Sequence, residues 1–493
     1  MNAVMTWLRK NGFSIGLILG SACLVFLVSF RLSEAPRTWY DEGIFLEVSK
    51  QIAEGNGIKM RSAPDQLESA TWFTTVGYPV LYPVAAVYAL GGRELWVLRL
   101  PMAAYVLALA FLGLTYAYVS FGKRSALVGF LLLVTYAPLY GNGKNILGEI
   151  PGLAWMFLAL YALARIQKGA RHPHWYMAVG LGLGLFAACK PNYLIALPFL
   201  LVPLVAMRKQ FARQGIILAA ASIFVTVILY YLTGFGDTTA LKEAYYGYIF
   251  SPGTQAVTGL SFIELLVKNT FRFVSEPTPA YVFVSMLVWT TAIVWRWRRH
   301  ESVLGAEWVA WTLALIAITY FLRSPGFYRY LLPAHILALA HLPYAGIWLT
   351  ERNSRHARSM KMLFMYALGA IIVLQLYLVG FNSWMARFYS GTRTAELSAF
   401  AKVEEAANHQ VLFIQAVEAS AFMRGTNYYQ YFEVPLLARS FGASSVASLE
   451  AALPNTVLIG SEYHELWKSR LGGYMHAGLL DGGKYQLYRR SDP

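Results

Sequence analysis

Two adjacent carboxylates, Asp41 and Glu42, have the residue type and the position to do chemistry. They follow the apolar run of residues 13–32, which has the roughly 20 residues that a helix needs to cross a hydrocarbon core. Acids just beyond a membrane are costly and are typical of functional sites. The alternative is that Asp41 only caps the following helix, because aspartate is a preferred N-cap residue. We favour a functional site to which the rest of the chain delivers two substrates.

A second set of charged residues is predicted on the same, outer side of the membrane. Glu149 is placed there, although a carboxylate beside a helix N-terminus is also explained by the helix dipole. An anionic group such as a lipid phosphate explains several cations near one membrane face, whereas snorkelling to the interface explains each cation only singly. Taken together, the cations favour a phosphate site. They are Lys144, Lys190, Arg323 and Arg329.

The composition restricts the class of protein. Of the 493 residues, 57% are hydrophobic and 14% are charged, and apolar runs recur along the whole chain, which predicts a polytopic α-helical membrane protein. The net charge of +15 would suggest nucleic acid in a soluble domain, but the cations cluster in short loops between apolar runs. We therefore expect membrane lipids and no nucleic acid as partners. The first apolar run lacks a cleavage site and is interpreted as a retained span.

The distribution of the cations predicts the orientation of the chain, because positively charged short loops face the cytoplasm. About eleven spans fit between these loops, with the N-terminus inside, and with the C-terminus and all the long loops outside. The cations that this topology places inside are Arg9 and Lys10; Lys123 and Arg124; Arg165, Lys168 and Arg171; Arg208, Lys209 and Arg213; Arg296, Arg298 and Arg299; Arg352, Arg355, Arg358 and Lys361.

The first outer segment, residues 33–98, is too long for a simple connection. Residues 42–54 carry apolar side chains at helical spacing and end at Gly55, which predicts a helix lying on the membrane surface. Residues 76–90 are apolar but short and contain two prolines, which predicts a second interfacial or re-entrant helix. The second true span then begins at Arg99.

Two further spans have features of interest. The third is predicted over residues 125–140. Residues 175–207 could form one helix, but Arg171 and Arg208 would then lie on opposite sides and spoil the charge alternation. We therefore predict two short spans hinged at Lys190-Pro191-Asn192. Each half is shorter than the roughly 30 Å core, which would leave Lys190 below the outer surface in a protein cavity.

The chain is predicted to form two domains. Residues 1–383 are the transmembrane domain and residues 384–493 are a small external α/β domain. Within the first, the outer loop of about residues 236–279 holds an apolar stretch, 260–267, which predicts a second membrane-surface element, and the last span is 362–381. The elements expected in the external domain are strands at residues 409–417, 456–460 and 484–489 and helices at residues 394–407 and 463–476.

Other motifs point to no ligand. Cys23 and Cys189 lie in apolar runs and are interpreted as packing residues. Glycines inside apolar helices are typical of close helix packing. The sequence has no P-loop, no His-Glu-x-x-His and no cysteine cluster, so neither ATP hydrolysis nor a zinc site has sequence support.

Several short motifs occur in a characteristic order. They are Asp41-Glu42, Gly77-Tyr78-Pro79, Leu81-Tyr82-Pro83, Arg99-Leu100-Pro101, Glu149-Ile150-Pro151, Lys190-Pro191 and Arg329-Tyr330-Leu331-Leu332-Pro333. This order resembles the GT-C superfamily of membrane glycosyltransferases, especially protein O-mannosyltransferases and the transferase that adds aminoarabinose to lipid A. The resemblance implies a GT-C-type fold of about 11 transmembrane helices with a small C-terminal extracytoplasmic α/β domain. Two positions depart from the family pattern: Glu149 stands where aspartate is common, and Thr74-Thr75-Val76 where a lysine often occurs.

The resemblance also implies an activity: an inverting glycosyltransferase of the bacterial inner membrane that moves a sugar from a polyprenyl-phosphate donor to a lipid, glycan or protein acceptor on the outer face. Asp41 would orient or deprotonate the acceptor hydroxyl, and Glu42 and Glu149 are the other candidate catalytic residues. Lys190 and Arg329 would hold the departing phosphate. The full set of candidate phosphate ligands is Lys144, Lys190, Arg323 and Arg329.

Some alternatives stay open at this point. A divalent metal is one, because oligosaccharyltransferase relatives use acidic residues with a divalent ion, whereas mannosyl and aminoarabinosyl transferases do not require one. A polytopic transporter or lipid flippase also has many spans and intramembrane charges, but this sequence shows no repeated halves and its acids are predicted at the outer edge. A noncatalytic scaffold, whose external domain binds a partner, would not need Asp41.

Overall fold

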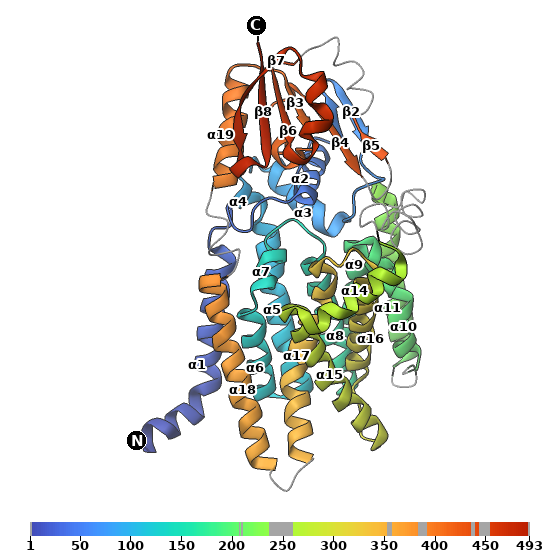
Figure 1. Cartoon of the computed structure of the whole chain (residues 1–493). Coiled ribbons are helices and arrows are strands. Elements are labelled where there is room, and N and C mark those ends of the chain that lie inside the picture. Colours follow the sequence, from blue (N-terminus) through green and yellow to red (C-terminus); the bar gives the residue numbers. More distant parts are fainter. Residues whose placement is uncertain are drawn as a thin grey trace.

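The chain folds into a long helical bundle with a smaller sheet-containing domain stacked on one end, as the computed structural model shows (Figure 1). We call this end of the bundle the domain end. The structure describes residues 2–206, 208, 211–235, 260–352, 357–382, 392–434, 439–442 and 454–491. The predicted domain border at 383/384 and the first part of the predicted loop 236–279 lie outside the described residues.

The bundle consists of long apolar helices, which confirms the predicted class of polytopic membrane protein. By length and composition, eight described helices could cross a membrane, or nine if a bent pair counts as one span. The prediction of about eleven spans also counted α9 (Pro173–Cys189) and α10 (Pro191–Ala206), which are shorter. The eight long helices are or include α1 (Asn2–Ser29), α5 (Leu100–Phe121), α8 (Glu149–Gln167), α11 (Arg213–Tyr230), α15 (Pro277–Arg298), α16 (Gly305–Arg323), α17 (Tyr328–Arg352) and α18 (Ala357–Tyr377).

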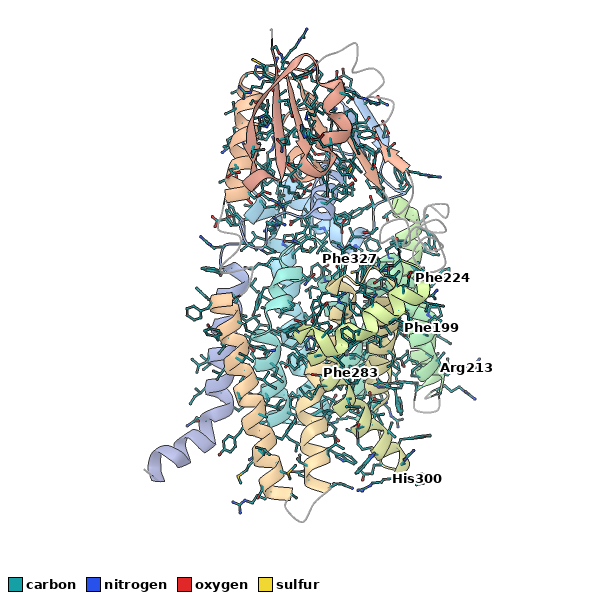
Figure 2. The ribbon with its side chains drawn as sticks, in the orientation of Figure 1. Phe199, Arg213, Phe224, Phe283, His300 and Phe327 are labelled. Carbon is teal, nitrogen blue, oxygen red and sulfur yellow. The ribbon has the colours of Figure 1, made fainter. Side chains whose placement is uncertain are left out.

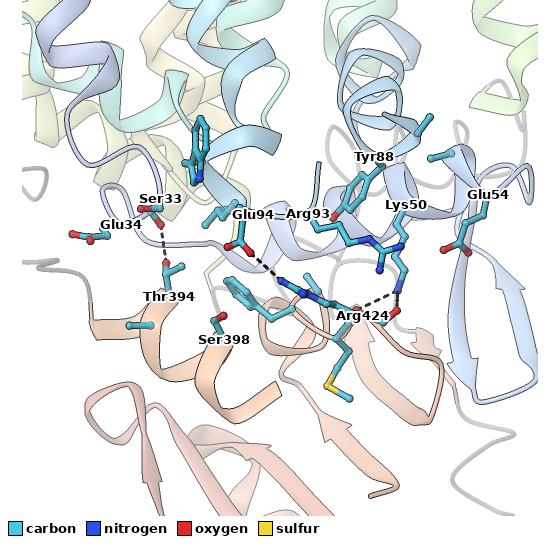
Figure 3. A pocket seen from close by; sticks show the side chains of 18 residues that line it. Ser33, Glu34, Lys50, Glu54, Tyr88, Arg93, Glu94, Thr394, Ser398 and Arg424 are labelled. Carbon is cyan, nitrogen blue, oxygen red and sulfur yellow. Dashed lines mark hydrogen bonds and ion pairs between the residues drawn. The ribbon is translucent and has the colours of Figure 1, made fainter. Parts of the chain in front are cut away.

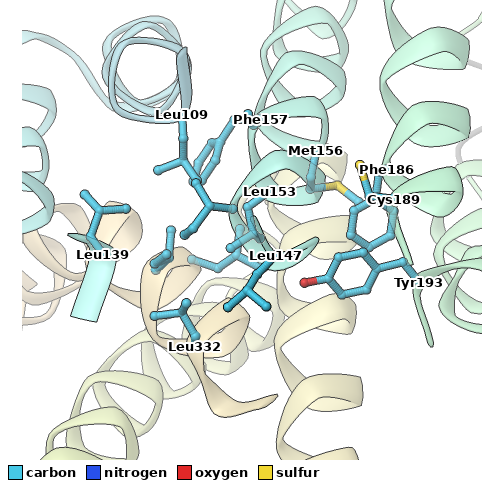
Figure 4. Packing of buried hydrophobic residues seen from close by; sticks show 14 of the residues in the cluster. Leu109, Leu139, Leu147, Leu153, Met156, Phe157, Phe186, Cys189, Tyr193 and Leu332 are labelled. Atoms are coloured by element: carbon cyan, nitrogen blue, oxygen red, sulfur yellow. The ribbon is translucent and has the colours of Figure 1, made fainter. Parts of the chain in front are cut away.

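Helices α8 and α17 form the centre of the bundle. In the apolar 18-residue stretch of each helix, the share of residues buried inside the protein is 78% for α8 and 89% for α17. The same share is only 17% for α11 and for α18. Figure 4 shows Phe157 of α8 packed near Leu109 of α5, with Leu332 of α17 farther along the same cluster of buried residues. The outer helices therefore present apolar side chains to their surroundings, as helices in contact with lipid do.

The third predicted span is bent, which corrects the prediction of one helix over residues 125–140. Helix α6 (Lys123–Val134) and helix α7 (Ala137–Gly143) meet at an angle of 60°. Pro138 lies in the first turn of α7, where its missing N–H and fixed φ suit a helix start but prevent continuation from α6.

The break between α9 and α10 falls at Lys190, where the hinge was predicted. Lys190 has an extended backbone (φ −152°, ψ 143°), and Pro191 begins α10. The N–H of Gly77 donates to the carbonyl of Cys189 (3.2 Å), so the start of α3 (Tyr78–Ala89), an earlier element of the chain, packs against this break. A Cβ at Gly77 would lie 2.0 Å from the carbonyl oxygen of Ala188, so only glycine permits this approach.

The segment before α5 contains the two predicted helices and a hairpin that was not predicted. Besides α3, it comprises α2 (Tyr40–Ala53), the strands β1 (Lys59–Ala63) and β2 (Gln66–Ser69), and the short α4 (Leu95–Leu98). The prediction that α2 lies on the membrane surface is wrong. Its residues from Glu42 to Ser49 are buried, because α3 covers one side and the C-terminal domain covers the other.

Helix α14 (Phe262–Ser275) matches the predicted second surface element. It is capped by Ser261, whose side chain accepts from the N–H of Glu264 while the Glu264 carboxylate accepts from the N–H of Ser261. Ile263, Val267 and Phe271 are each more than 60% exposed on it. In Figure 1 the helix crosses the outside of the bundle obliquely, as an amphipathic interfacial helix would.

The C-terminal domain is an α/β structure around a six-stranded sheet of order β5-β4-β3-β6-β8-β7. Its central strand β3 is parallel to both neighbours, and β8 is antiparallel to β6 and β7. Helix α19 and strands β3, β6 and β8 match predicted elements, whereas the predicted helix 463–476 is correct only up to Arg470, because residues 474–476 belong to β7. The elements are α19 (Thr392–Ala406), β3 (Val411–Ile414), α20 (Val417–Ser420), β4 (Tyr428–Val434), β5 (Arg439–Phe441), β6 (Thr456–Gly460), α22 (His464–Trp467), β7 (Tyr474–Leu480) and β8 (Tyr485–Arg490).

A fully buried ion pair fastens α2 to the bundle. Arg99, just before α5, donates from Nε and Nη2 to the two carboxylate oxygens of Glu42 (2.8 and 2.7 Å). Its Nη1 donates to the carbonyls of Leu32 and Pro36, and the N–H of Ile146 donates to Glu42 Oε1 (3.2 Å). Neither side chain of the pair is exposed, and one guanidinium thus joins three segments of the chain.

Replacing Arg99 by alanine should destabilise the protein strongly, because it leaves the Glu42 carboxylate buried without its cation. Breaking a buried pair in this way costs about 3–5 kcal/mol, which would appear as a large fall in melting temperature of the detergent-solubilised protein. Arg31→Ala is the matched control, since its pair with Glu34 is about one-third exposed and should contribute less than about 1 kcal/mol. Equal melting temperatures for the two variants would contradict this role of Arg99.

Candidate active site

Asp41 and Arg329 form an ion pair between the first turn of α2 and the first turn of α17. An Arg329 Nη1–H donates to Asp41 Oδ2. The side chain of Asp41 is 29% exposed and that of Arg329 is 15% exposed, so the pair is partly open. Glu42, the next residue along α2, turns instead into the protein toward Arg99. Of the two adjacent acids, only Asp41 can therefore meet a substrate.

A second pair lies close to the first. Lys190, at the break between α9 and α10, donates from Nζ to Oε1 of Glu149, the first residue of α8. Both side chains are at least nine-tenths buried. Oε2 of Glu149 and Nε of Arg329 are buried polar atoms with no hydrogen-bond partner in the described part of the chain. Such atoms are expected where a polar ligand completes the site.

A cavity of about 380 Å³ joins these charged groups to an apolar interior. Its polar end is formed by Glu149, Lys190, Arg323 and Arg329. Its body runs between α10 and α16 and is almost wholly apolar. The side chains that line this body include Tyr193, Ile195, Ala196, Phe199, Leu313, Leu315, Ile316 and Ala317.

A second cavity, of about 350 Å³, touches the same arginine from another direction. Three aromatic rings, those of Trp39, Phe327 and Tyr328, line it together with Pro138, Asn142 and Thr278. Arg329 is the residue that borders both cavities. The Asp41–Arg329 pair therefore lies beside both cavities, with Arg329 lining each of them.

The charge of Asp41 is set by its surroundings. Removal from water raises the pKa of its carboxyl, but the guanidinium of Arg329, through its charge and its hydrogen bond, and the ammonium of Lys190 outweigh this effect. The net result is a pKa below the usual range of an aspartate. Asp41 is thus ionised at neutral pH, and only acidification below that range would protonate it.

The structure brings together five of the seven predicted site residues. Asp41, Glu149, Lys190, Arg323 and Arg329 line the cavity with the apolar body or pair with a residue that does. Two residues lie elsewhere and are better explained as structural: Glu42, which binds Arg99, and Lys144, whose buried Nζ donates to the carbonyl of Phe30 (2.5 Å).

Sequence reasoning missed most of the cavity walls. The α16 side chains that line the apolar body are apolar residues of a long apolar helix. No sequence pattern distinguishes them from residues that face lipid. The aromatic residues of the second cavity had a weak signal, because Trp39 adjoins the acidic motif and Phe327 adjoins Arg329. Within the described ranges, no three His, Cys, Asp or Glu side chains come together as a metal site.

A third cavity, of about 370 Å³, lies away from Asp41, between the segment before α5 and the C-terminal domain (Figure 3). Arg424 pairs with Glu94 across it (2.9 Å). Lys50 of α2 donates to the carbonyls of Met423 and Arg424 (3.2 and 3.4 Å). None of the predicted site residues lines this cavity, which is best described as the seam between the two parts of the protein.

The C-terminal domain also holds the start of α2. A Cβ at Gly43 would lie 2.7 Å from the backbone N and Cα of Glu418 in α20, so α20 rests directly on the helix two residues from Asp41. Tyr40 donates its hydroxyl to the carbonyl of Glu433 (3.3 Å) and packs edge-on against Phe432. The position of Asp41 is thus fixed on one side by the C-terminal domain, which contacts α2, and on the other side by Arg329 of the bundle.

Comparisons with known proteins agree with this architecture. Residues 79–231 match a family model described as dolichyl-phosphate-mannose-protein mannosyltransferase. A comparison with curated protein sequences finds no significant match. Among solved structures, ArnT from Cupriavidus metallidurans bound to undecaprenyl phosphate is similar with a TM-score of 0.62 and 14% identity, over 97% of this chain and 98% of that one.

Two other solved structures share the fold. AglB, an oligosaccharyltransferase from Archaeoglobus fulgidus in complex with an inhibitory peptide and a dolichol-phosphate, gives a TM-score of 0.58 at 12% identity over 99% of this chain and 75% of that one. The arabinofuranosyltransferase AftD from Mycobacteria gives 0.56 at 13% identity over 98% of this chain and 40% of that one. The chain thus shares the fold of these solved structures, which agrees with the fold that the GT-C resemblance predicted, and the family model matches the part of the bundle from residue 79 to residue 231.

Replacing Gly43 by alanine should displace Asp41. The new methyl group would lie 2.7 Å from backbone atoms of Glu418 in α20, so α2 or α20 must shift. A displacement of this kind can lower the turnover number by about 10- to 100-fold. The measurement is the turnover number of the reaction that is proposed below for Asp41. Gly369→Ala is the control, since a Cβ there meets nothing within 4 Å. Normal kcat in Gly43→Ala would refute the role of this contact.

Proposed function

We propose that this protein transfers a sugar from a polyprenyl-phosphate donor, with inversion at the anomeric carbon, to an acceptor that reaches Asp41 from the second cavity. The observation that carries the proposal is the first cavity, whose apolar body ends at three cations beside an ionised aspartate. An isoprenoid chain and a phosphate are the ligand parts that such a cavity fits. The ArnT structure, of the same fold, has undecaprenyl phosphate bound.

The donor phosphate would bind at the polar end. Lys190, Arg323 and Arg329 lie there, and Nε of Arg329 has no partner in the described part of the chain. Arginine is well suited to a phosphate because its planar guanidinium offers several parallel N–H groups. The prenyl chain would lie between α10 and α16, where its burial removes apolar surface from water and requires no polar partner.

The transfer itself needs a nucleophile, an anomeric carbon and a leaving group in line. The acceptor hydroxyl oxygen attacks the anomeric carbon from the face opposite the phosphate, and the bond from this carbon to the phosphate oxygen breaks. The electron pair of that bond leaves with the polyprenyl phosphate, whose new negative charge is stabilised by Arg329 and Lys190. The hydroxyl proton passes to Asp41, whose carboxylate is ionised at neutral pH.

Glu149 would act beside this step rather than in it. Its Oε1 holds Lys190 in place, and its free Oε2 can accept a hydrogen bond from a hydroxyl group of the donor sugar. Because the pair is buried, Glu149 also offsets the charge that Lys190 would otherwise carry alone into a low-dielectric site. In this proposal Glu149 is a positioning acid and Asp41 is the base.

The proposal includes the orientation of the protein in the membrane. The cationic loops predict a cytoplasmic N-terminus, and the site lies at the domain end of the bundle. Figure 2 shows Phe327, next to Arg329, at that end and His300 at the opposite end. We therefore assign the protein to the bacterial inner membrane, with Asp41 and the domain after residue 383 on the periplasmic or extracellular side. A transporter or flippase is not favoured, because its substrate would not need a base and a phosphate site together.

Replacing Asp41 by asparagine should abolish transfer while the protein stays folded. The amide keeps the shape of the side chain but cannot take the proton, and loss of a general base typically costs about 10²–10⁴-fold in rate. The measurement is transfer of radiolabelled sugar from a panel of polyprenyl-phosphate sugars to membrane extracts, with and without a chelator. Asp65→Asn, on an exposed turn, is the control.

The possible outcomes of that assay separate the hypotheses. Activity lost in Asp41→Asn and kept in Asp65→Asn supports the proposal, and a chelator effect would assign a divalent metal to the reaction. Undiminished transfer by Asp41→Asn, at equal amounts of folded protein, would refute the catalytic role of this carboxylate.

A further inference from the structure

The second cavity carries information about the acceptor, and the inference from it rests on the proposed function. Its walls are chemically different from those of the first cavity. They combine three aromatic rings, Trp39, Phe327 and Tyr328, with the amide of Asn142 and the hydroxyl of Thr278. Among the described residues that line it, the one charged side chain is that of Arg329, which is already paired with Asp41.

Two of the three aromatic residues that line the cavity are partly exposed. The side chain of Trp39 stands at the first residue before α2, and the whole residue is 36% exposed; Phe327 is 46% exposed, although both are large apolar residues. The Tyr328 hydroxyl bonds to Nδ1 of His335 (2.8 Å), which fixes that ring from behind. Exposed aromatic side chains that gather around one cavity are typical of binding sites.

The polar groups are also pre-arranged. Asn142 donates from Nδ2 to the carbonyl of Pro138 (3.0 Å), which fixes the amide plane at the bend between α6 and α7. Its carbonyl oxygen can then accept from a hydroxyl group of a ligand. The Thr278 hydroxyl can donate or accept. The cavity thus offers flat apolar faces together with a few uncharged hydrogen-bonding groups.

Aromatic faces together with uncharged hydrogen-bonding groups suit some classes of acceptor better than others. An acyl chain would need a long aliphatic groove, as the first cavity has, and a phosphorylated or acidic acceptor would need cations that are not already paired. A peptide serine or threonine needs an extended cleft with backbone partners. A sugar ring has an apolar C–H face that stacks on an aromatic ring and hydroxyl groups around its edge, and the volume of about 350 Å³ holds a ligand of that size.

We propose that the second cavity binds a neutral sugar unit of the acceptor, stacked on Trp39, so that the group that is glycosylated is a sugar hydroxyl of a glycan or glycolipid. The position fits the transfer. Trp39 is two residues from Asp41, and Arg329 borders both cavities, so a hydroxyl of the stacked sugar would lie between the base and the donor.

The test is binding of uncharged methyl glycosides and disaccharides to the full-length protein, measured by saturation-transfer NMR, with a serine- and threonine-containing peptide as the competing probe. Trp39→Ala should weaken glycoside binding by up to about tenfold, the size expected for loss of one aromatic contact, and Trp39→Phe should keep most of it. Trp96→Ala is the matched control, because Trp96 is 50% exposed but lies in the third cavity. Thermal unfolding should be alike for all three variants.

Transfer kinetics give the second readout. With glycan acceptors, Trp39→Ala should raise KM for the acceptor and leave KM for the donor unchanged. The inference is overturned if no glycoside binds in a Trp39-dependent way, or if only the peptide is glycosylated with equal efficiency by the wild type and Trp39→Ala. These results differ from failure of the proposed function itself, which would appear as full transfer by Asp41→Asn.

Discussion

The ion pair between Asp41 and Arg329 joins parts of the chain that are 288 residues apart, and the arrangement of the site follows from it. Asp41 belongs to a helix held outside the bundle, whereas Arg329 begins one of the two central helices. Without the arginine, a partly buried carboxylate would tend to take up a proton. With it, the acid stays charged beside the one arginine that lines both cavities among the described residues.

Three local features of the helices bring these site residues together. The break at Lys190 brings a lysine into the protein interior beside Glu149. The bend after α6 turns Asn142 toward the second cavity. At Gly43, the backbone of α20 in the C-terminal domain packs directly against α2. Each feature coincides with a proline or a glycine. Proline interrupts a helix, and glycine allows another segment of backbone to come close. The C-terminal domain therefore contributes to the geometry of the site, although the charged site residues found in the described part of the chain come from α2 and the bundle.

The sequence predicted features that depend on local pattern and could not predict those that depend on packing. Apolar length and cationic loops indicated the spans, and Lys190-Pro191 indicated the hinge. Successive residues of a helix point about 100° apart, so Asp41 and Glu42 cannot both face one cavity, but only the fold shows that Glu42 meets Arg99. Likewise, the apolar pattern of α2 suits burial against lipid or against protein. The helix predicted over 463–476 ends early, at Arg470, because Gly472-Gly473 follow and the chain then enters β7 as a strand of the sheet.

The most direct test of the account is the affinity of the full-length protein for polyprenyl phosphates of increasing chain length. We predict that affinity rises with chain length, falls in Arg323→Gln at the polar end and falls in Ala317→Trp, which fills the apolar body. Ala395→Trp, in the third cavity, should bind as the wild type does. Affinity that is independent of chain length, or unchanged in both Arg323→Gln and Ala317→Trp, would contradict the assignment of this cavity to the donor.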